Sequence, residues 1–181
     1  YEVLQTREPG GSSLGELVRQ WLLMPSKEAR LCARAELCLF LASRAQHIEE
    51  VINPALEAGK IILCDRFNDS TIAYQGIGRG LGLDYVKQLC TLICEGVTPD
   101  LTFYLDIAPE IGLGRVAKAD RGDSLDRIEQ EALSFHERIR KGFLQIAAKE
   151  KSRIHVIDAH QSREEVLQQV FEVIEPRLIR L

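Results

Sequence analysis

Residues 61–80 read IILCDRFNDSTIAYQGIGRG. The apolar run 61–64 stops abruptly at Asp65 and Arg66, a pattern that predicts a short strand with a charged tip. Ligands of open α/β sheets bind outside the carboxyl ends of the parallel strands, so we expect this pair to face a substrate crevice. There the arginine would meet an anion and the aspartate a cation.

The segments on either side of this stretch alternate between strand and helix patterns. Further strands are predicted at residues 2–6, 101–106 and 154–157. Helices are predicted at 12–23, 28–51, 70–75, 84–95, 109–118, 126–150 and 162–174, with breaks at Asn53-Pro54 and Glu175-Pro176. A further short helix is predicted between Asn53-Pro54 and Gly59. The apolar face of the first helix is predicted to comprise Leu14, Leu17, Val18, Trp21 and Leu22. This alternation predicts the α/β class, with a parallel sheet covered by helices on both faces in a single domain spanning residues 1–181.

The charge balance argues against a polyanion as the main partner. The formal net charge is -4 and the isoelectric point is about 5.7, so the protein has no general attraction for nucleic acid. Yet 16 of the 23 basic residues are arginines, whose planar fork suits phosphates and carboxylates. Local arginine clusters therefore favour small phosphorylated ligands over nucleic acid.

Five cysteines are present, at positions 32, 38, 64, 90 and 94, without the spacing of a zinc site. We expect them to be small buried thiols, which suits a reducing cytoplasm. The sequence contains no run of eighteen apolar residues, so no membrane segment is predicted.

Residues 10–17 come close to the phosphate-binding motif G-x-x-x-x-G-K-[ST]. Glu16 and Leu17 stand where that motif needs lysine and a hydroxyl residue, so the loop would set a negative charge against phosphates. We interpret it as a turn followed by a helix start. Arg7 and Arg19 flank it and could hold one phosphate monoester; alternatively, Arg7 forms a surface ion pair with a neighbouring glutamate.

Phe40 and Arg44 lie four residues apart and share a helix face. An aromatic plane beside a guanidinium can stack on a base and donate hydrogen bonds to its edge. The alternative is a core phenylalanine and a solvated arginine. His47, on the next turn, is expected to be polar surface.

A denser cluster follows the charged strand tip. Thr71, Tyr74 and Gln75 fall within about one helical turn and offer hydroxyl, aromatic and amide groups for reading a nucleoside. Core packing explains Tyr74 equally well. Arg66 could bridge the phosphates of two substrates.

Residues 118–126, KADRGDSLD, have the charged and turn-rich composition of a flap. Arg115, Arg121 and Arg127 surround it, and such a flap can bring positive charge onto a transferring phosphoryl group. A solvated loop is the alternative. Asp106 and Asp158, at the ends of predicted strands, have strand termination as their simplest role.

Four blocks occur in the order and spacing of one family. They read TREPGG at 6–11, FLASR at 40–44, DRF at 65–67 followed by ST at 70–71 and AYQG at 73–76, and PDLT at 99–102. Over essentially the whole chain, the sequence resembles the bacterial thymidylate kinases. The resemblance implies a three-layer P-loop kinase fold with five parallel strands, of which four are visible here, and transfer of the γ-phosphoryl of ATP to dTMP with Mg²⁺. It also implies a cytoplasmic homodimer. A kinase for another nucleoside monophosphate and a non-catalytic nucleotide-binding protein are the alternatives.

The resemblance also implies roles for individual residues. Phe40 would stack on thymine, Arg44 would hydrogen-bond its edge, and Thr71 and Gln75 would complete the pocket. Tyr74 would pack against the deoxyribose, and Arg19 and Arg66 would grip the dTMP phosphate. Asp65 would help organise the metal or its waters. Glu8 would lie near the sugar of dTMP and the metal-bound phosphates, and would act on the metal through water. On the donor side, Arg121 would face the phosphates from the flap, and the donor nucleotide would meet Arg115, Asp158, Ala159 and His160.

In the family a strand, the phosphate-binding loop and a helix precede the segment that corresponds to Tyr1. We therefore expect this unit to lie upstream of the 181 residues, because a parallel sheet without its central strand would expose backbone edges and apolar faces.

Overall fold

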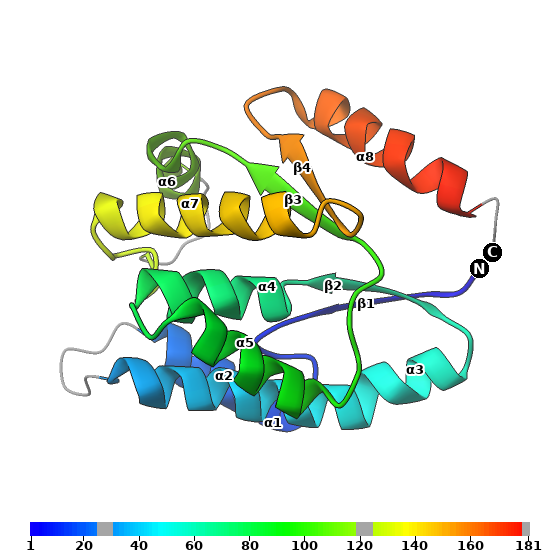
Figure 1. Ribbon diagram of the computed structural model, residues 1–181, viewed down its shortest axis with the longest axis horizontal. Coiled ribbons are helices and arrows are strands. Elements are labelled where there is room, and N and C mark those ends of the chain that lie inside the picture. The colour runs from blue at the N-terminus through cyan, green and yellow to red at the C-terminus, as the bar shows by residue number, and fades with distance from the viewer. Residues whose placement is uncertain (25–30, 119–124, 179–181) are drawn as a thin grey trace.

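The computed structural model describes residues 1–24, 31–118 and 125–178, and strands and helices alternate along the chain (Figure 1). The strands are β1 (Val3–Arg7), β2 (Ile61–Asp65), β3 (Thr102–Asp106) and β4 (Ile154–Asp158). The α-helices are α1 (Ser13–Leu23), α2 (Ala33–His47), α3 (Asn53–Glu57), α4 (Asn68–Thr71), α5 (Leu83–Cys94), α6 (Pro109–Lys118), α7 (Leu133–Lys149) and α8 (Arg163–Leu178). Two π-helical segments, η1 (Ile48–Ile52) and η2 (Ile72–Gly78), continue α2 and α4. The predicted α/β class is confirmed.

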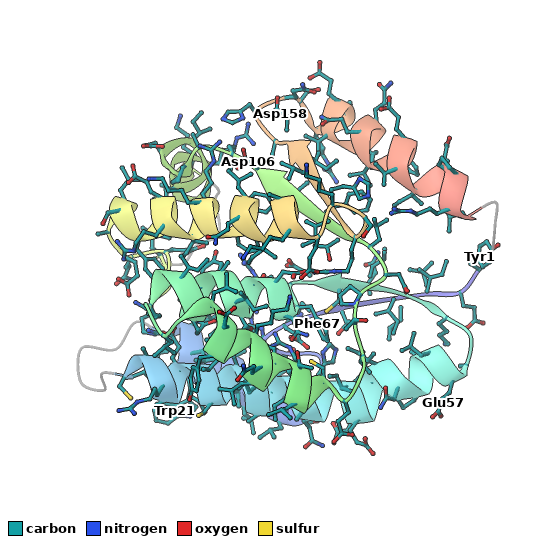
Figure 2. The ribbon with its side chains drawn as sticks, in the orientation of Figure 1. Tyr1, Trp21, Glu57, Phe67, Asp106 and Asp158 are labelled. Atoms are coloured by element: carbon teal, nitrogen blue, oxygen red, sulfur yellow. The ribbon has the colours of Figure 1, made fainter. Side chains whose placement is uncertain are left out.

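The strands form two parallel pairs. In one, β1 lies beside β2 with Arg7 opposite Asp65; in the other, β3 lies beside β4 with Asp106 opposite Asp158. Within the described ranges β2 and β3 do not pair, so the expected continuous sheet is present as two two-stranded sheets. Figure 2 shows Asp106 and Asp158 together at the same end of their pair.

The strands are less covered than those of a typical parallel sheet. Leu63 in β2 is 50% exposed and Leu105 in β3 is 51% exposed. Parallel strands are normally buried on both faces. Among the described residues, these strands are therefore only partly covered.

The main core joins α2, η2, α5 and α7. Leu37, Ala73, Val86 and Phe135 lie at its centre, each no more than 3% exposed. Close approach between η2 and α7 requires a glycine, because a Cβ on Gly78 would lie 2.9 Å from the Phe135 ring. This packing brings the inward faces of α2 and η2 together, and these faces carry several of the predicted site residues.

Helix α1 begins where the sequence predicts, with the Ser12 hydroxyl accepting a hydrogen bond from the Gly15 N–H. The apolar face predicted for this helix is wider than the face that the structure buries. Val18 and Leu22 are buried, whereas Leu14, Leu17 and Trp21 are exposed (Figure 2, Trp21). Only the narrow stripe formed by Val18 and Leu22 meets the core.

Several predicted helix boundaries were wrong. The helix predicted from residue 28 begins at Ala33 as α2, and residues 28–30 lie outside the described part of the chain. Asn53-Pro54 does not break the helix, because Asn53 keeps helical angles (φ -57°, ψ -49°) and Pro54, which has no N–H to pair, follows directly on the π-helical turn of η1. Helix α7 begins at Leu133, since the Asp126 carboxylate accepts the N–H groups of Ile128 and Glu129 and holds a turn there. Helix α8 continues past Pro176 to Leu178.

One buried ion pair ties the two sheets. The Asp69 carboxylate in α4 accepts two hydrogen bonds from the Arg153 guanidinium, at 2.7 and 2.8 Å, and the Thr102 hydroxyl at the start of β3 donates to it at 3.3 Å. Arg153 also contacts Glu150 at 2.6 Å. The cluster connects the segment that follows β2 to the starts of β3 and β4.

The cysteines divide into two groups. Cys90 and Cys94 are buried and Cys64 is half-buried, but Cys32 and Cys38 are exposed, which corrects the expectation that all five are buried. All are free thiols. None of the helices within residues 1–24, 31–118 and 125–178 is both long and apolar enough to cross a lipid bilayer. The two ends of the described chain lie close together, and the Tyr1 hydroxyl donates to the Leu178 carbonyl at 3.3 Å (Figure 1).

Candidate functional site

The ends of β1 and β2 place charged side chains next to one another. Register sets Arg7 opposite Asp65, and the Glu8 N–H donates to the Asp65 carbonyl at 2.9 Å. Asp65 and Arg66 are both exposed at this tip. Arg66 has φ +70°, a left-handed conformation that non-glycine residues rarely adopt, and its guanidinium lies 5.2 Å from the centre of the Tyr74 ring.

A buried charged cluster lies behind this tip. Glu8 accepts a hydrogen bond from Arg44 Nε at 2.7 Å and one from His47 Nδ1 at 3.0 Å, while His47 Nε2 lies 2.7 Å from the Thr6 hydroxyl. Arg44 is 1% exposed and His47 is fully buried. The expectation that His47 is polar surface was therefore wrong, as was the alternative of a solvated Arg44.

The charge of Arg44 is maintained by its neighbours. Burial opposes that charge, but the Glu8 carboxylate outweighs this cost and raises the pKa of the guanidinium above its ordinary value. The Phe67 ring adds a cation–π contact at 5.0 Å. A fixed cation and a carboxylate thus lie together beneath the strand tip.

Helices α2 and η2 bring together the residues predicted to read a base. Arg44 Nη2 donates to the Thr71 hydroxyl at 3.0 Å, and Gln75, one turn further along, is 1% exposed. Phe40 is half-buried on α2, one turn before Arg44. Tyr74 makes edge contacts with the rings of Phe135 and Phe143, with centroids 6.4 and 6.2 Å apart. Tyr74 thus has the core packing that was its alternative.

Sequence reasoning missed Glu36. This glutamate in the first turn of α2 is 1% exposed and accepts hydrogen bonds from Gln75, Arg79 and Arg127. Its partners are 39 to 91 residues away in the chain, so no local pattern reveals the cluster. The one available signal was a lone acidic residue on the inward side of an otherwise apolar helix stripe with Leu37 and Phe40.

The arginines near the first loop differ in their contacts. Arg7 forms an exposed ion pair with Glu16 at 2.8 Å, which confirms the alternative given for it. Glu16 also accepts the Gly11 N–H at 3.1 Å, so its carboxylate helps to hold the turn. Arg19 donates to the Pro9 carbonyl at 3.0 Å and is only partly buried.

A second group of predicted residues lies at the ends of β3 and β4. Arg115 in α6 donates to the Ala159 carbonyl at 3.0 Å. His160 Nε2 accepts the Ala108 N–H, so Nδ1 carries the proton and donates to Asp158 at 2.8 Å. Hydrogen bonds from His160 lower the pKa of the Asp158 carboxyl. The residues predicted for the donor nucleotide are therefore adjacent.

Asp106 does more than end a strand. It accepts two hydrogen bonds from Arg140, at 2.7 and 2.8 Å, and these lower the pKa of its carboxyl despite partial burial. Arg121 and most of the 118–126 flap lie outside the described residues. Arg127, just beyond them, donates to the Leu22 carbonyl and to Glu36, and is thus anchored inside the fold.

Preformed metal ligands are sparse. Within the part of the chain that the structure describes, no three His, Cys, Asp or Glu side chains gather as a metal-binding group. Both Glu8 oxygens accept hydrogen bonds from Arg44 and His47, which leaves the exposed Asp65 carboxylate as the better candidate. Mg²⁺ commonly uses one or two carboxylates together with substrate phosphates and water, and Asp65 fits that arrangement.

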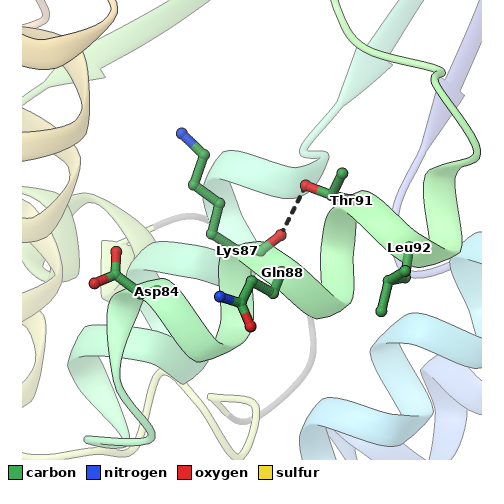
Figure 3. A pocket seen from close by; sticks show the side chains of 5 residues that line it. All are labelled: Asp84, Lys87, Gln88, Thr91 and Leu92. Carbon is green, nitrogen blue, oxygen red and sulfur yellow. Dashed lines mark hydrogen bonds between the residues drawn. The ribbon is translucent and has the colours of Figure 1, made fainter.

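An open depression of about 590 Å³ lies on α5, lined by Asp84, Lys87, Gln88, Thr91 and Leu92 (Figure 3). Its polar groups are partly used within the helix, since the Thr91 hydroxyl donates to the Lys87 carbonyl at 3.0 Å. All five residues come from one helix, and Lys87 pairs with Glu150 at 2.9 Å, on the side of the Asp69 and Arg153 cluster and not of the strand ends. The strand ends, not this depression, are the candidate active site.

The sequence and the structure were compared with those of known proteins. The thymidylate kinase family model matches residues 1–170. A thymidylate kinase of Protochlamydia amoebophila (strain UWE25) is 52% identical over 179 residues, covering 97% of this chain and 80% of that protein, and one of Desulfovibrio desulfuricans (strain ATCC 27774 / DSM 6949 / MB) is 47% identical over 184 residues, covering 99% and 84%. The crystal structure of thymidylate kinase from Ehrlichia chaffeensis is 37% identical and matches 96% of this chain and 80% of that one with a TM-score of 0.73. The chain belongs to the thymidylate kinase family.

Proposed function

We propose that this protein transfers the γ-phosphoryl group of ATP to dTMP, giving dTDP and ADP. The observation that carries the proposal is the convergence of Arg44, Thr71 and Gln75 beneath the β2 tip in a chain of the thymidylate kinase family. A pocket for a base needs polar groups that are fixed in place, because each must form a hydrogen bond with an atom on the edge of the bound base. The Arg44 to Thr71 hydrogen bond and the Glu8 contact supply that rigidity.

The thymine would lie between these polar groups and the half-buried Phe40 ring. Stacking on Phe40 would supply affinity, and Arg44, Thr71 and Gln75 would contact the edge of the base. Tyr74, already packed against Phe135 and Phe143, would offer a rigid wall to the sugar.

The acceptor phosphate would lie near the guanidinium of Arg66, with Arg19 approaching from α1. Phosphoryl transfer passes through a loose transition state, so alignment and charge neutralisation matter more than covalent help from the protein. Arg66 at the strand tip would hold the nucleophilic phosphate in line, and Arg121 would add charge from the flap. Arg115, Asp158, Ala159 and His160 would contact the donor nucleotide.

Asp65 would hold Mg²⁺, directly or through water, and Glu8 would act only through water because its oxygens are occupied. The metal would neutralise charge on the phosphates of ATP. Asp65 is exposed at the end of β2, and this supports its proposed role as an oxygen ligand.

We also propose that a further parallel strand lies between β2 and β3 and carries the phosphate-binding loop. Among the described residues each of these strands pairs on one side only, and Leu63 in β2 and Leu105 in β3 are half-exposed. Thr102 at the start of β3 and Arg153 just before β4 both contact Asp69, which follows β2 in the chain, so the starts of this pair lie close to the segment after β2. One strand in that position would give the five-stranded sheet and cover both leucines.

Assembly as a cytoplasmic homodimer through the long helices is part of the same proposal. Exposed apolar side chains on helices support it: Leu17 is 59% exposed, Trp21 67% and Leu92 71%. Light scattering after gel filtration measures the mass directly, and a monomer at micromolar concentration would contradict the homodimer.

A coupled assay of ADP formation by the complete gene product, with ATP, Mg²⁺ and dTMP, tests the activity. Parallel reactions with dUMP, dCMP and dGMP distinguish a thymidylate kinase from a kinase for another monophosphate. Nucleotide binding without ADP formation would instead indicate a non-catalytic binding protein. Phe40→Ala should weaken dTMP binding with the fold intact, which circular dichroism checks.

A further inference from the structure

The Glu36 carboxylate is one of the most thoroughly occupied acceptors in the molecule. It receives Gln75 Nε2 at 2.8 Å, Arg79 Nε and Nη2 at 3.0 and 3.1 Å, and Arg127 Nη2 at 2.6 Å. Its side chain is 1% exposed, and those of Arg79 and Arg127 are 16% and 18% exposed. Three segments far apart in the chain therefore meet at one charge.

This contact decides which way the Gln75 amide points. An ionised carboxylate can only accept hydrogen bonds, so the Gln75 atom that faces it must be the NH₂ group. The planar amide then directs its carbonyl oxygen Oε1 away from Glu36. Among the described residues none donates a hydrogen bond to Oε1, so this acceptor remains for a ligand.

Glu36 is ionised at neutral pH. Burial alone would raise the pKa of its carboxyl, but hydrogen bonds from Arg79, Gln75 and Arg127 outweigh burial and lower it below its ordinary value. The acceptor-only state that fixes Gln75 is thus maintained by the two arginines.

We propose that Glu36 is a positioning residue for base specificity, which holds the Gln75 carbonyl oxygen toward the pyrimidine and thereby selects bases that carry a proton on N3. This inference rests on the proposed function, because it assigns Gln75 to the dTMP pocket. Thymine and uracil have an N3–H donor that pairs with a carbonyl oxygen. Cytosine has an unprotonated N3 acceptor, which would face Oε1 without a hydrogen. Glu36 therefore disfavours cytosine through Gln75, without contacting the base itself.

Equilibrium binding of dTMP and dCMP to the complete gene product, measured by calorimetry, tests this role without relying on catalysis. In Glu36→Gln the new side chain can donate as well as accept, so the Gln75 amide is free to turn over. We expect the ratio of dCMP to dTMP dissociation constants to fall about tenfold or more, the effect of one lost hydrogen-bond preference. Glu36→Asp, which keeps the charge, should retain most of the preference.

Glu131→Gln is the matched control. Glu131 pairs with Arg79 in the same network but does not touch Gln75. Its replacement should weaken the network and leave the dCMP to dTMP ratio unchanged. If Glu36→Gln is too unstable to purify, the double variant Glu36→Gln with Arg127→Met removes the unpaired guanidinium as well and carries the same expectation.

An equal loss of affinity for both nucleotides in Glu36→Gln, with the ratio preserved, would overturn the inference and leave Glu36 as a purely structural residue. A wild-type protein that prefers dTMP but forms no ADP would refute the proposed activity and leave the specificity role intact. A wild-type protein that binds neither nucleotide would refute both.

Discussion

Replacing Asp69 with alanine should destabilise the protein strongly, because this carboxylate joins the β2 side of the fold to the β3 and β4 side. Asp69 is 6% exposed and accepts two short hydrogen bonds from Arg153 and one from Thr102. Asp69→Ala leaves the Arg153 guanidinium half-partnered in a site that is only 20% exposed.

The expected loss of stability depends on the contacts that Arg153 keeps in Asp69→Ala. Removing one partner of a fully buried ion pair costs about 3–5 kcal/mol, because the other charge is left uncompensated. Arg153 keeps Glu150 at 2.6 Å and has some access to water, which reduces the cost. We therefore expect Asp69→Ala to lower the free energy of unfolding by about 2–3 kcal/mol.

Urea unfolding followed by circular dichroism measures this difference. With a slope of about 2–3 kcal/mol per molar urea, the midpoint should fall by about 1 M. Glu2→Gln is the control, since it breaks an exposed pair with Lys60 and should leave the midpoint unchanged. A midpoint in Asp69→Ala equal to that of the wild type would refute the reasoning that this pair links the two sheets.

Three further outcomes are expected. Iodoacetamide at pH 8 should label the exposed Cys32 and Cys38 first, since burial raises the pKa of Cys64 to about 12 and that of Cys90 to about 11; early labelling of Cys90 by peptide mass spectrometry would contradict this. Gly78→Ala should lower the free energy of unfolding by about 1–3 kcal/mol, because the new methyl group would crowd the Phe135 ring. Gly114→Ala, with nothing within 4 Å of its Cβ, should raise it by about 0.5–1 kcal/mol. Equal melting temperatures of the two variants in thermal unfolding would refute the packing argument. The Arg140 contact lowers the pKa of Asp106 in the folded state. The stabilisation from this contact is therefore complete above the unfolded-state pKa of about 3.9, and it is lost as the pH falls through the folded-state pKa. Arg140→Gln should therefore be less stable than the wild type at pH 7 and converge with it in acid, and a difference that stays constant with pH would exclude this linkage.

Local patterns predicted the elements that local physics determines. An apolar run that stops at a charge marked β2, and a serine before an apolar stripe marked the start of α1. The errors arose where distant contacts or backbone continuity outweigh a local signal. Asn53-Pro54 reads as a break in isolation, yet the helical backbone passes through it into α3. The turn at Asp126 uses side-chain hydrogen bonds that helical periodicity does not register.

The candidate site was predicted in part for the same reason. The i to i+4 spacing of Phe40 and Arg44 placed both on one helix face, but it did not show that Glu8 would bury the arginine. His47 looked like surface because its partners, Thr6 and Glu8, lie about forty residues away along the chain. Glu36 was overlooked because three of its partners come from two other segments. Buried charge networks are built by topology, and a single sequence does not display topology directly.

Arg66, at the strand tip, has a consequence for protein engineering. An arginine held at φ +70° costs about 1–2 kcal/mol relative to a residue free to adopt that conformation, and glycine is such a residue. A screen that rewards heat tolerance alone should therefore enrich Arg66→Gly, while a screen for turnover should reject it, since the proposed function assigns the Arg66 charge to the acceptor phosphate. At this position a ranking of variants by melting temperature would run opposite to their ranking by activity.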